Sequence, residues 1–581
     1  MERRPTPVTR GAATRAGDHG FVAEPRDLAA LLRAQGLPVP GAPTAAEAAA
    51  ADQPIADWAR SGLMWLTGRP DGPPLAPTGP VLARARASAG ILDAFGPLPS
   101  GPSPHGRATG GGSAAAEPSS AELTSEAPSG VPASGTSTVG AVDLVLGGRA
   151  ALLGLTRRGA VSANGTCRLA RCADGWVALN LARPDDADLV GALLERDLGP
   201  PAGDGSADGG TLELAWAAFA IAARERPAAD LVDRARLLGL PAAALAPRPA
   251  SRPGPAVARS SGQASERPCV AVHPIGRPRT NGPASRPIVL DLSALWAGPL
   301  CARLLGDAGL RVIKLESVTR PDGARAGNRT FYDWLHGGHA SVAVDFTSRS
   351  GLAALAALVA RADVVIESTR PRALAQLGID AWAVVAARPG VTWVSVTGYG
   401  RDTDGGPGAV AFGDDAAVAG GLVAWDDYPA GGATPGSDAA AHDGSAVGHG
   451  GAGAGGQRSA GRPVFCADAI ADPLTGLYAA AAARASVAAG GGHLLEVSMS
   501  AVAAHANASG SAGPGPAEPD RAGAGAVRAT QSGSDGRWWV GVGNGRIEVA
   551  PPRGPSRSGL RPAAALGADT RAVLAELGTP G

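Results

Sequence analysis

The chain has few cysteines and no paired metal-ligand motif. Its 581 residues include 5 cysteines, and none of them stands in a Cys-x-x-Cys pair. A sparse, odd-numbered set argues against a disulfide scaffold and favours a reducing compartment, so we expect a cytoplasmic protein. A structural zinc site needs clustered pairs of ligands. The sequence shows none, and we expect no metal.

Net charge and long apolar runs are also missing. The 52 basic and 52 acidic residues cancel, which argues against a general electrostatic binder of nucleic acid or membranes. No run of about 18 apolar residues occurs, so no membrane span is expected. The first 20 residues are basic but lack a continuous apolar core, so we do not expect a signal peptide.

Glycine and proline are abundant, with 84 and 50 residues, and they gather in four segments. These segments hold too few large apolar side chains to offset the entropy cost of ordering, so we expect disorder there. The glycine-rich stretch also lacks the GxxxxGK[ST] pattern of a phosphate loop. The expected order is a tail at 1–20, a helical segment at 21–98, a linker at 99–139, a small domain at 140–247, a second linker at 248–285, a main domain at 286–428, a Gly-rich insertion at 429–461 and a continuation of the main domain at 462–581.

Residues 286–400 alternate between short apolar runs and helical patterns. The runs RPIVLDL, RVIKLES, HASVAVDF, ADVVIEST and VTWVSV are apolar on both faces. This alternation predicts a Rossmann-like α/β fold with an open parallel sheet covered by helices, whose ligands bind at the carboxyl ends of strands. Residues 175–182 predict a strand of a smaller α+β domain, and 568–577 predict a terminal helix. A hairpin is expected to turn at Asn544-Gly545.

The residues from 286 to 510 resemble the class III coenzyme A transferases, the CaiB/BaiF family. The resemblance rests on IVLDLSALWAGPLCARLLGDAGLRVIKLES, FYDWLHGGHASVAVDF, ADVVIESTRPRALAQLGID, VTWVSVTGYGRD, ADPLTGLYAA and GGGHLLEVSMSAVAAH. These occur in the family's order and are interrupted by the Gly-rich insertion. The α-methylacyl-CoA racemases share this fold.

The front of the chain resembles other parts of the same family. Residues 56–77 are similar to the segment before the catalytic aspartate, and 167–190 to the small domain that normally follows the main one. We therefore expect a permuted order, with an imperfect repeat of the central segment at 56–95. The repeat places Arg86 opposite Asp472. An arginine cannot act as a nucleophile, so the second copy would hold the reaction centre.

Asp472 is the candidate nucleophile because the resemblance places it in the family's D-x-x-x-G register, ending at Gly476. Pro473 favours a helix start, which predicts Asp472 as the N-cap of that helix. There the helix dipole and exposed amides would keep the carboxylate ionised. A plain cap without catalysis is the alternative, although the two roles are compatible. Asp468 is a weaker candidate, otherwise expected as a solvated or hydrogen-bonded loop residue.

The resemblance implies transfer of CoA from an acyl-CoA to a carboxylic acid through a covalent aspartyl-CoA intermediate. Coenzyme A is then a substrate, and no resident cofactor is required. The family forms interlocked dimers, which implies a homodimer here. Nucleic acid and membranes are not expected as partners.

Other site residues follow from the resemblance alone. Trp296 stands where formyl-CoA transferase has a glutamine near the thioester, which suggests a different acyl pocket; a core tryptophan is the alternative. His339 and Ala340 replace a Lys-Arg pair, so phosphate binding would be weaker or use other groups. The full set implied for substrate and CoA binding is Trp296, Ala297, Lys314, Arg325, His339, Glu367, Ser368, Arg372 and Gly476.

Two other functions stay open. A racemase needs a second acid/base, normally the histidine of a Gly-His-Asp motif. This chain has Gly413-Asp414-Asp415 instead, which counts against racemisation. An inactive CoA-binding protein would fit the rearranged order, the missing Lys-Arg pair and the long insertions.

Overall fold

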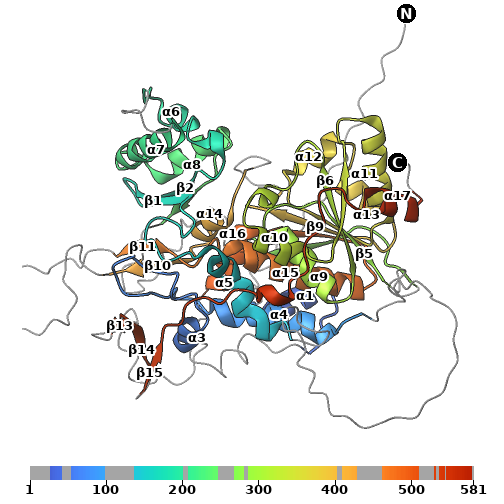
Figure 1. Cartoon of the computed structure of the whole chain (residues 1–581), viewed down its shortest axis with the longest axis horizontal. Coiled ribbons are helices and arrows are strands. Elements are labelled where there is room, and N and C mark those ends of the chain that lie inside the picture. The colour runs from blue at the N-terminus through green and yellow to red at the C-terminus, as the bar shows by residue number, and fades with distance from the viewer. Residues whose placement is uncertain are drawn as a thin grey trace, which may run out of the picture.

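The structure is a computed structural model of the chain (Figure 1). The four segments expected to be loose lie entirely or mostly outside the described residues. The structure describes 27–41, 54–98, 137–199, 207–246, 267–280, 286–401, 409–427, 461–508, 529–531, 536–542 and 545–578.

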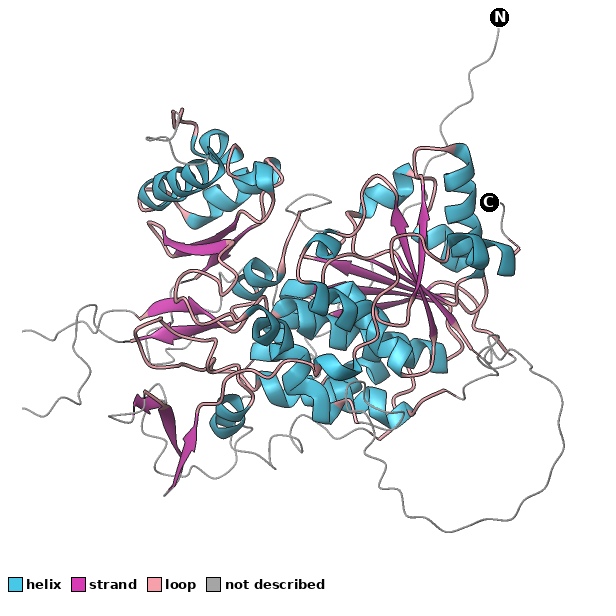
Figure 2. Ribbon diagram, in the orientation of Figure 1, coloured by secondary structure: helices cyan, strands magenta, loops and turns pink. Residues whose placement is uncertain are grey.

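A seven-stranded sheet forms the centre of the main domain (Figure 2). Six strands are parallel, and β4 pairs antiparallel with β12 at one edge. The predicted Rossmann-like α/β fold is confirmed, because the apolar runs at 286–400 form the buried parallel strands. The strand order is β4 (Val270–Pro274), β12 (His493–Ser498), β9 (Thr392–Thr397), β8 (Val364–Glu367), β5 (Ile288–Asp291), β6 (Arg311–Ser317) and β7 (Ala340–Val344).

Strand β4 corrects the prediction that 248–285 is linker throughout. Cys269 and Val270 are buried, and Ala271 pairs with Glu496 of β12 in register. The segment is short and flanked by proline and glycine, so the local sequence resembles a loop. Pairing with a strand more than 200 residues away makes it the edge of the sheet.

Helices cover both faces of the sheet. One face packs on α11, α13 and α17, and the other on a larger helical layer built around α9 and α15. The predicted terminal helix is confirmed by α17. The helices are α1 (Leu28–Ala34), α3 (Pro54–Arg60), α4 (Val81–Phe95), α5 (Val142–Leu153), α9 (Ala297–Asp307), α10 (Arg329–His336), α11 (Arg349–Arg361), α12 (Pro371–Gln376), α13 (Ala381–Ala387), α14 (Gly413–Ala419), α15 (Ala471–Ala488), α16 (Met499–Asn507) and α17 (Thr570–Glu576).

The front helices belong to the main core. Leu82 and Ile91 of α4 and Leu146 of α5 share one buried cluster with Leu300 of α9 and Leu477 of α15. Helix α15 is rich in alanine, and small side chains let neighbouring helices approach it on several sides. The segment predicted at 21–98 therefore packs directly against the part of the chain that holds Asp472 (Figure 1).

Among the described residues, three small antiparallel sheets lie outside the main one. The first, with strands β1, β2 and β3, carries helices α6, α7 and α8 (Figure 1). The predicted strand at 175–182 is confirmed by β2. The β14–β15 pair confirms the predicted hairpin; Asn544, where the turn was expected, lies outside the described residues. Bounds are β1 (Cys167–Arg171), β2 (Trp176–Asn180), β3 (Ala242–Leu245), α6 (Leu189–Leu194), α7 (Ala207–Ala223), α8 (Ala228–Leu237), β10 (Val423–Asp426), β11 (Arg462–Phe465), β13 (Ala529–Gln531), β14 (Trp538–Val542) and β15 (Gly545–Glu548).

Within the described ranges, no helix is both long and apolar enough to cross a membrane.

Candidate active site

The loop before α15 is strained and aims acidic side chains inward. Ala467 and Ala469 have φ angles of 55° and 41°, a region that costs an L-residue of order 1 kcal/mol. Asp468 between them is fully buried. Such strain persists where surrounding contacts hold it, and it is common at functional sites.

Asp472 lies inside the first turn of α15 and is not its N-cap, so that prediction is wrong. The helix begins at Ala471, its N-cap is Ile470, and no side chain caps it. The Asp472 amide donates to the Ala469 carbonyl at 2.9 Å. Proline disfavours helical angles in the preceding residue, Asp472, but does not forbid them. Pro473 has no backbone N–H, and none is needed in the first turn of a helix, where the N–H groups have no intrahelical acceptor.

Four carboxylates gather around the head of α15, and we call them the acidic cluster. Two come from the first turn of α14, one from the strained loop and one from α15. The Asp414 Oδ1 accepts a hydrogen bond from the Ala469 amide at 3.0 Å, which ties α14 to the loop. The members are Asp414, Asp415, Asp468 and Asp472.

Side chains from the small domain hold the two aspartates of α14. Asn164 donates to Asp414 Oδ2 at 3.2 Å, and Asn180 of β2 donates to Asp415 Oδ1 at 3.0 Å. The Tyr399 hydroxyl donates to Asp415 Oδ2 at 3.3 Å. Buried carboxylates need such partners, so the small domain is structurally part of this site.

Arg149 of α5 supplies positive charge to the acidic cluster. Its Nη1 donates to both oxygens of Asp468 at 2.7 Å. The guanidinium carbon lies 5.3 Å from the centre of the Trp296 ring and 5.8 Å from that of Phe331. The arginine is therefore fixed both by a carboxylate and by two aromatic faces.

Burial and like charges raise the pKa values in the acidic cluster. Burial raises the pKa of Asp472 to about 8; the carboxylates of the other three members add to the rise, and Arg149 opposes it. Burial and the Asp468 charge raise the pKa of Asp414 to about 7. Burial brings the pKa of Asp415 to about 6. Burial and repulsion thus favour the neutral form of Asp472, whereas the sequence led us to expect a helix start that favours the ionised form.

Gly413 lies against the Asp472 carboxylate. A Cβ at this position would stand 2.5 Å from Asp472 Oδ2 and 2.2 Å from the Ala469 carbonyl oxygen. We expect Gly413→Ala to displace the carboxylate and to lower the rate of the CoA transfer that the resemblance implies by about 100-fold, because small misplacements of reacting groups are costly. Steady-state kinetics tests this. The control is Gly541→Ala, whose added Cβ meets nothing within 4 Å; equal losses in both variants would contradict the prediction.

Ala297 and Gly476 meet where α9 crosses α15, and Trp296 is the N-cap of α9. Trp296 is 3% exposed, packs edge-on against Phe331 at 5.5 Å, and its buried Nε1 has no acceptor among the described residues. A Cβ on Gly476 would stand 2.8 Å from the Ala297 carbonyl oxygen. Glycine therefore allows the two helices to approach, which places Trp296 at the same end of α9 as the acidic cluster.

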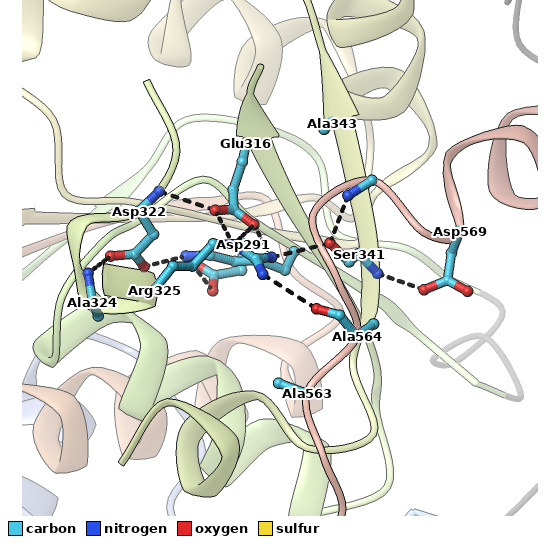
Figure 3. Close-up of polar contacts among 12 residues, drawn as sticks. Asp291, Glu316, Asp322, Ala324, Arg325, Ser341, Ala343, Ala563, Ala564 and Asp569 are labelled. Carbon is cyan, nitrogen blue, oxygen red and sulfur yellow. Dashed lines mark hydrogen bonds and ion pairs between the residues drawn. The ribbon is translucent and has the colours of Figure 1, made fainter. Parts of the chain in front are cut away.

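Lys314 lies within β6, and Arg325 lies beside this strand in a polar network with Glu316 and Ser341 (Figure 3). Lys314 is 1% exposed, and its Nζ lies 3.4 Å from Asp291 Oδ2 and 3.1 Å from Asp322 Oδ2. Burial lowers the pKa of Lys314, but these carboxylates outweigh it and the pKa ends above its ordinary value. Arg325 donates to Glu316 at 2.5 to 3.1 Å. Both cations are engaged inside the protein, so this arrangement supports a structural role.

The remaining predicted CoA contacts differ in accessibility. Glu367 is buried and accepts from Arg401 at 2.9 Å and from Trp393 at 3.0 Å. Burial, with the positive charge of Arg303, lowers the pKa of His339 to about 3, so it is neutral. Ser368 is partly exposed, and Arg372 is exposed. These last two remain the accessible candidates at the end of β8.

Sequence reasoning missed the residues that the front of the chain contributes. Arg149, Asn164 and Asn180 contact the acidic cluster from positions far away in the chain, and Thr67 Oγ1 accepts from the Ala467 amide at 3.1 Å. No local motif marks them. Within the described part of the chain, no group of three or more His, Cys, Asp or Glu side chains could hold a metal ion.

Comparisons with known proteins agree with the resemblance over part of the chain. Residues 287–426 match the sequence model of CoA-transferase family III. A succinyl-CoA–D-citramalate CoA-transferase of Chloroflexus aurantiacus is 33% identical over 150 residues, which cover 24% of this chain and 37% of that protein. A succinate–glutarate CoA-transferase of Agrobacterium fabrum is 31% identical over 137 residues, covering 21% and 34%.

The chain spans about a third of the length of the curated relatives it matches. A crystal structure of a CAIB/BAIF family protein from Brucella suis is 22% identical and covers 38% of this chain and 53% of that chain, with a TM-score of 0.28. A score this low carries no argument about the whole arrangement. The likeness to CoA-transferase family III is therefore found over residues 287–426 of the main domain.

Proposed function

We propose that the protein transfers coenzyme A from an acyl-CoA to a carboxylic acid through a covalent intermediate on Asp472. The observation that carries this proposal is the position of Asp472 in the first turn of α15, with its carboxylate against Gly413 of the segment that matches the family. The names of the relatives, all CoA-transferases, support the activity.

The reaction proceeds by two exchanges at the carboxylate. An oxygen of Asp472 attacks the thioester carbonyl, the C–S bond breaks, and CoA leaves as a thiolate from a mixed anhydride. The thiolate attacks Cγ of Asp472, which releases the donor acid and leaves an aspartyl-CoA thioester. The acceptor carboxylate then attacks Cγ and expels the thiolate, which attacks the acceptor's acyl carbon and returns Asp472 as a carboxylate.

This mechanism determines the substrates and the cofactor requirement. The partners are an acyl-CoA and a carboxylic acid, coenzyme A is a substrate, and no step calls for a resident cofactor. A cytoplasmic homodimer is part of the same proposal, and light scattering of the purified chain measures its mass. Exchange of labelled CoA between a panel of acyl-CoAs and free acids tests the activity. Absence of exchange with every donor tried, in a folded protein, would contradict it.

The rate of exchange should rise with pH through about 8. Only the ionised carboxylate is a nucleophile, and the pKa of Asp472 is raised to about 8 by burial and its acidic neighbours. Because the folded-state pKa exceeds the unfolded one, the stability from this group is full below pH ~4 and is lost as pH rises towards 8. Initial rates between pH 5.5 and 9.5 test the prediction. A rate that is already constant between pH 5.5 and 7 would contradict it.

A further inference from the structure

The acidic cluster is held from outside the family-matched domain. Thr67 and Arg149 hold the strained loop, through the Ala467 amide and the Asp468 carboxylate. Asn164 and Asn180 hold Asp414 and Asp415 of α14. All four lie between residues 67 and 180, whereas the match to the family begins at 287. The front of the chain therefore completes the site instead of forming a separate module.

Arg149 differs from the other three because it carries charge. The charged groups that act on Asp472 are Arg149 from α5, Asp414 and Asp415 from α14, and Asp468 from the loop. Three of these are negative and one is positive. In a poorly solvated site, a nearby positive charge favours the ionised form of a carboxylate.

The Arg149 guanidinium is also held in position from two sides. The Asp468 carboxylate holds Nη1, and the faces of Trp296 and Phe331 hold the guanidinium plane. The side chain is 21% exposed, and Asp468 is 0% exposed. A lysine here would keep the charge but lose the planar group that matches both the carboxylate and the rings.

We infer that Arg149 is a positioning residue of the active site: it anchors the Asp468 loop and supplies the positive charge that keeps Asp472 available as a nucleophile. This inference rests on the proposed function, since it assigns a role in that reaction. It adds a residue from α5 that no motif of the main domain contains.

The direct test follows the protonation of Asp472 itself. Infrared difference spectra between wild type and Asp472→Asn identify the carboxylic-acid C=O band of this residue, and its pH midpoint is measured. In Arg149→Met we expect the midpoint to move upward by about one pH unit or more. Exchange at pH 7.5 should then fall by about tenfold, because one pH unit changes the ionised fraction tenfold below the midpoint.

Three further variants separate charge from packing. Arg149→Lys keeps the charge, so its midpoint should stay within about half a pH unit of wild type. Asp468→Asn removes a like charge and frees Arg149, so its midpoint should move downward. Arg168→Met is the matched control, because Arg168 also pairs with a carboxylate, Glu213, and stacks on an aromatic ring, Trp216, in the small domain. It should leave the midpoint unchanged.

The outcomes distinguish the inference from the proposed function. A midpoint that stays at the wild-type value in Arg149→Met would overturn the inference and reduce Arg149 to a packing residue. If Arg149→Met does not fold, an unshifted midpoint in Asp468→Asn would overturn it. A wild-type protein that shows the expected midpoint shifts but exchanges no CoA would refute the proposed function and leave the electrostatic role of Arg149 intact.

Discussion

Asp472→Asn should lower CoA exchange by at least about 1,000-fold, because the amide cannot attack a thioester and no covalent intermediate forms. Steady-state exchange with the best acyl-CoA donor measures the effect. The fold should persist, since the substitution removes a carboxylate whose ionised form is disfavoured by burial. Asp472→Asn should therefore be as stable as wild type, or more stable, near pH 8.

The control for this substitution is Asp380→Asn. Asp380 lies near a helix start too, as the N-cap of α13, where its side chain accepts from the Trp382 and Ala383 amides. It should retain wild-type exchange. Exchange that survives in Asp472→Asn, with the protein folded, would remove Asp472 from the mechanism and leave Asp414 or Asp468 as the group to test next.

Lys314→Met should lower the free energy of unfolding by about 3–5 kcal/mol, because it leaves Asp291 and Asp322 buried without their cation. Urea denaturation at pH 7 measures the change. The matched control is Arg311→Met, which breaks a partly exposed ion pair with Glu576 and should cost less than about 1 kcal/mol.

The same variant tests the role that the family resemblance implied for Lys314. The structural account predicts that Lys314→Met/Asp291→Asn recovers part of the lost stability, since it removes one uncompensated charge. A Lys314→Met protein of wild-type stability with a raised KM for acyl-CoA would contradict this account and restore Lys314 as a CoA contact.

The parallel sheet was predictable because the apolar pattern that identifies each strand lies within the strand itself. Strands such as β5 and β9 are apolar on both faces and stand between helical patterns, which identifies a covered parallel sheet in any single sequence. Strand β4 has a similar apolar core, yet its flanks look like a loop. Its identity depends on pairing with β12, a contact across more than 200 residues that local patterns do not encode.

In the site, too, residues in a local motif could be predicted and residues held by long-range contacts could not. The D-x-x-x-G register singles out Asp472 as a candidate, and its role stays a prediction. Its position relative to the helix start could not be predicted, because proline only disfavours helical angles in the preceding residue and here Asp472 adopts them. Arg149 could not be found, since its contact with Asp468 spans 319 positions. Arg86, which the repeat places opposite Asp472, instead pairs with Asp57 at 2.8 Å. The repeat could not indicate this partner of Arg86, and its placement of the nucleophile in the second copy stays a prediction.

The most direct measurement of the central claim is mass spectrometry of the Asp472 peptide after incubation with an acyl-CoA and no acceptor. The proposed mechanism predicts a CoA thioester on Asp472 that hydroxylamine removes and that is missing in Asp472→Asn. A protein that turns over acyl-CoA with an acceptor while CoA is found attached to another residue, or to none, would contradict the mechanism.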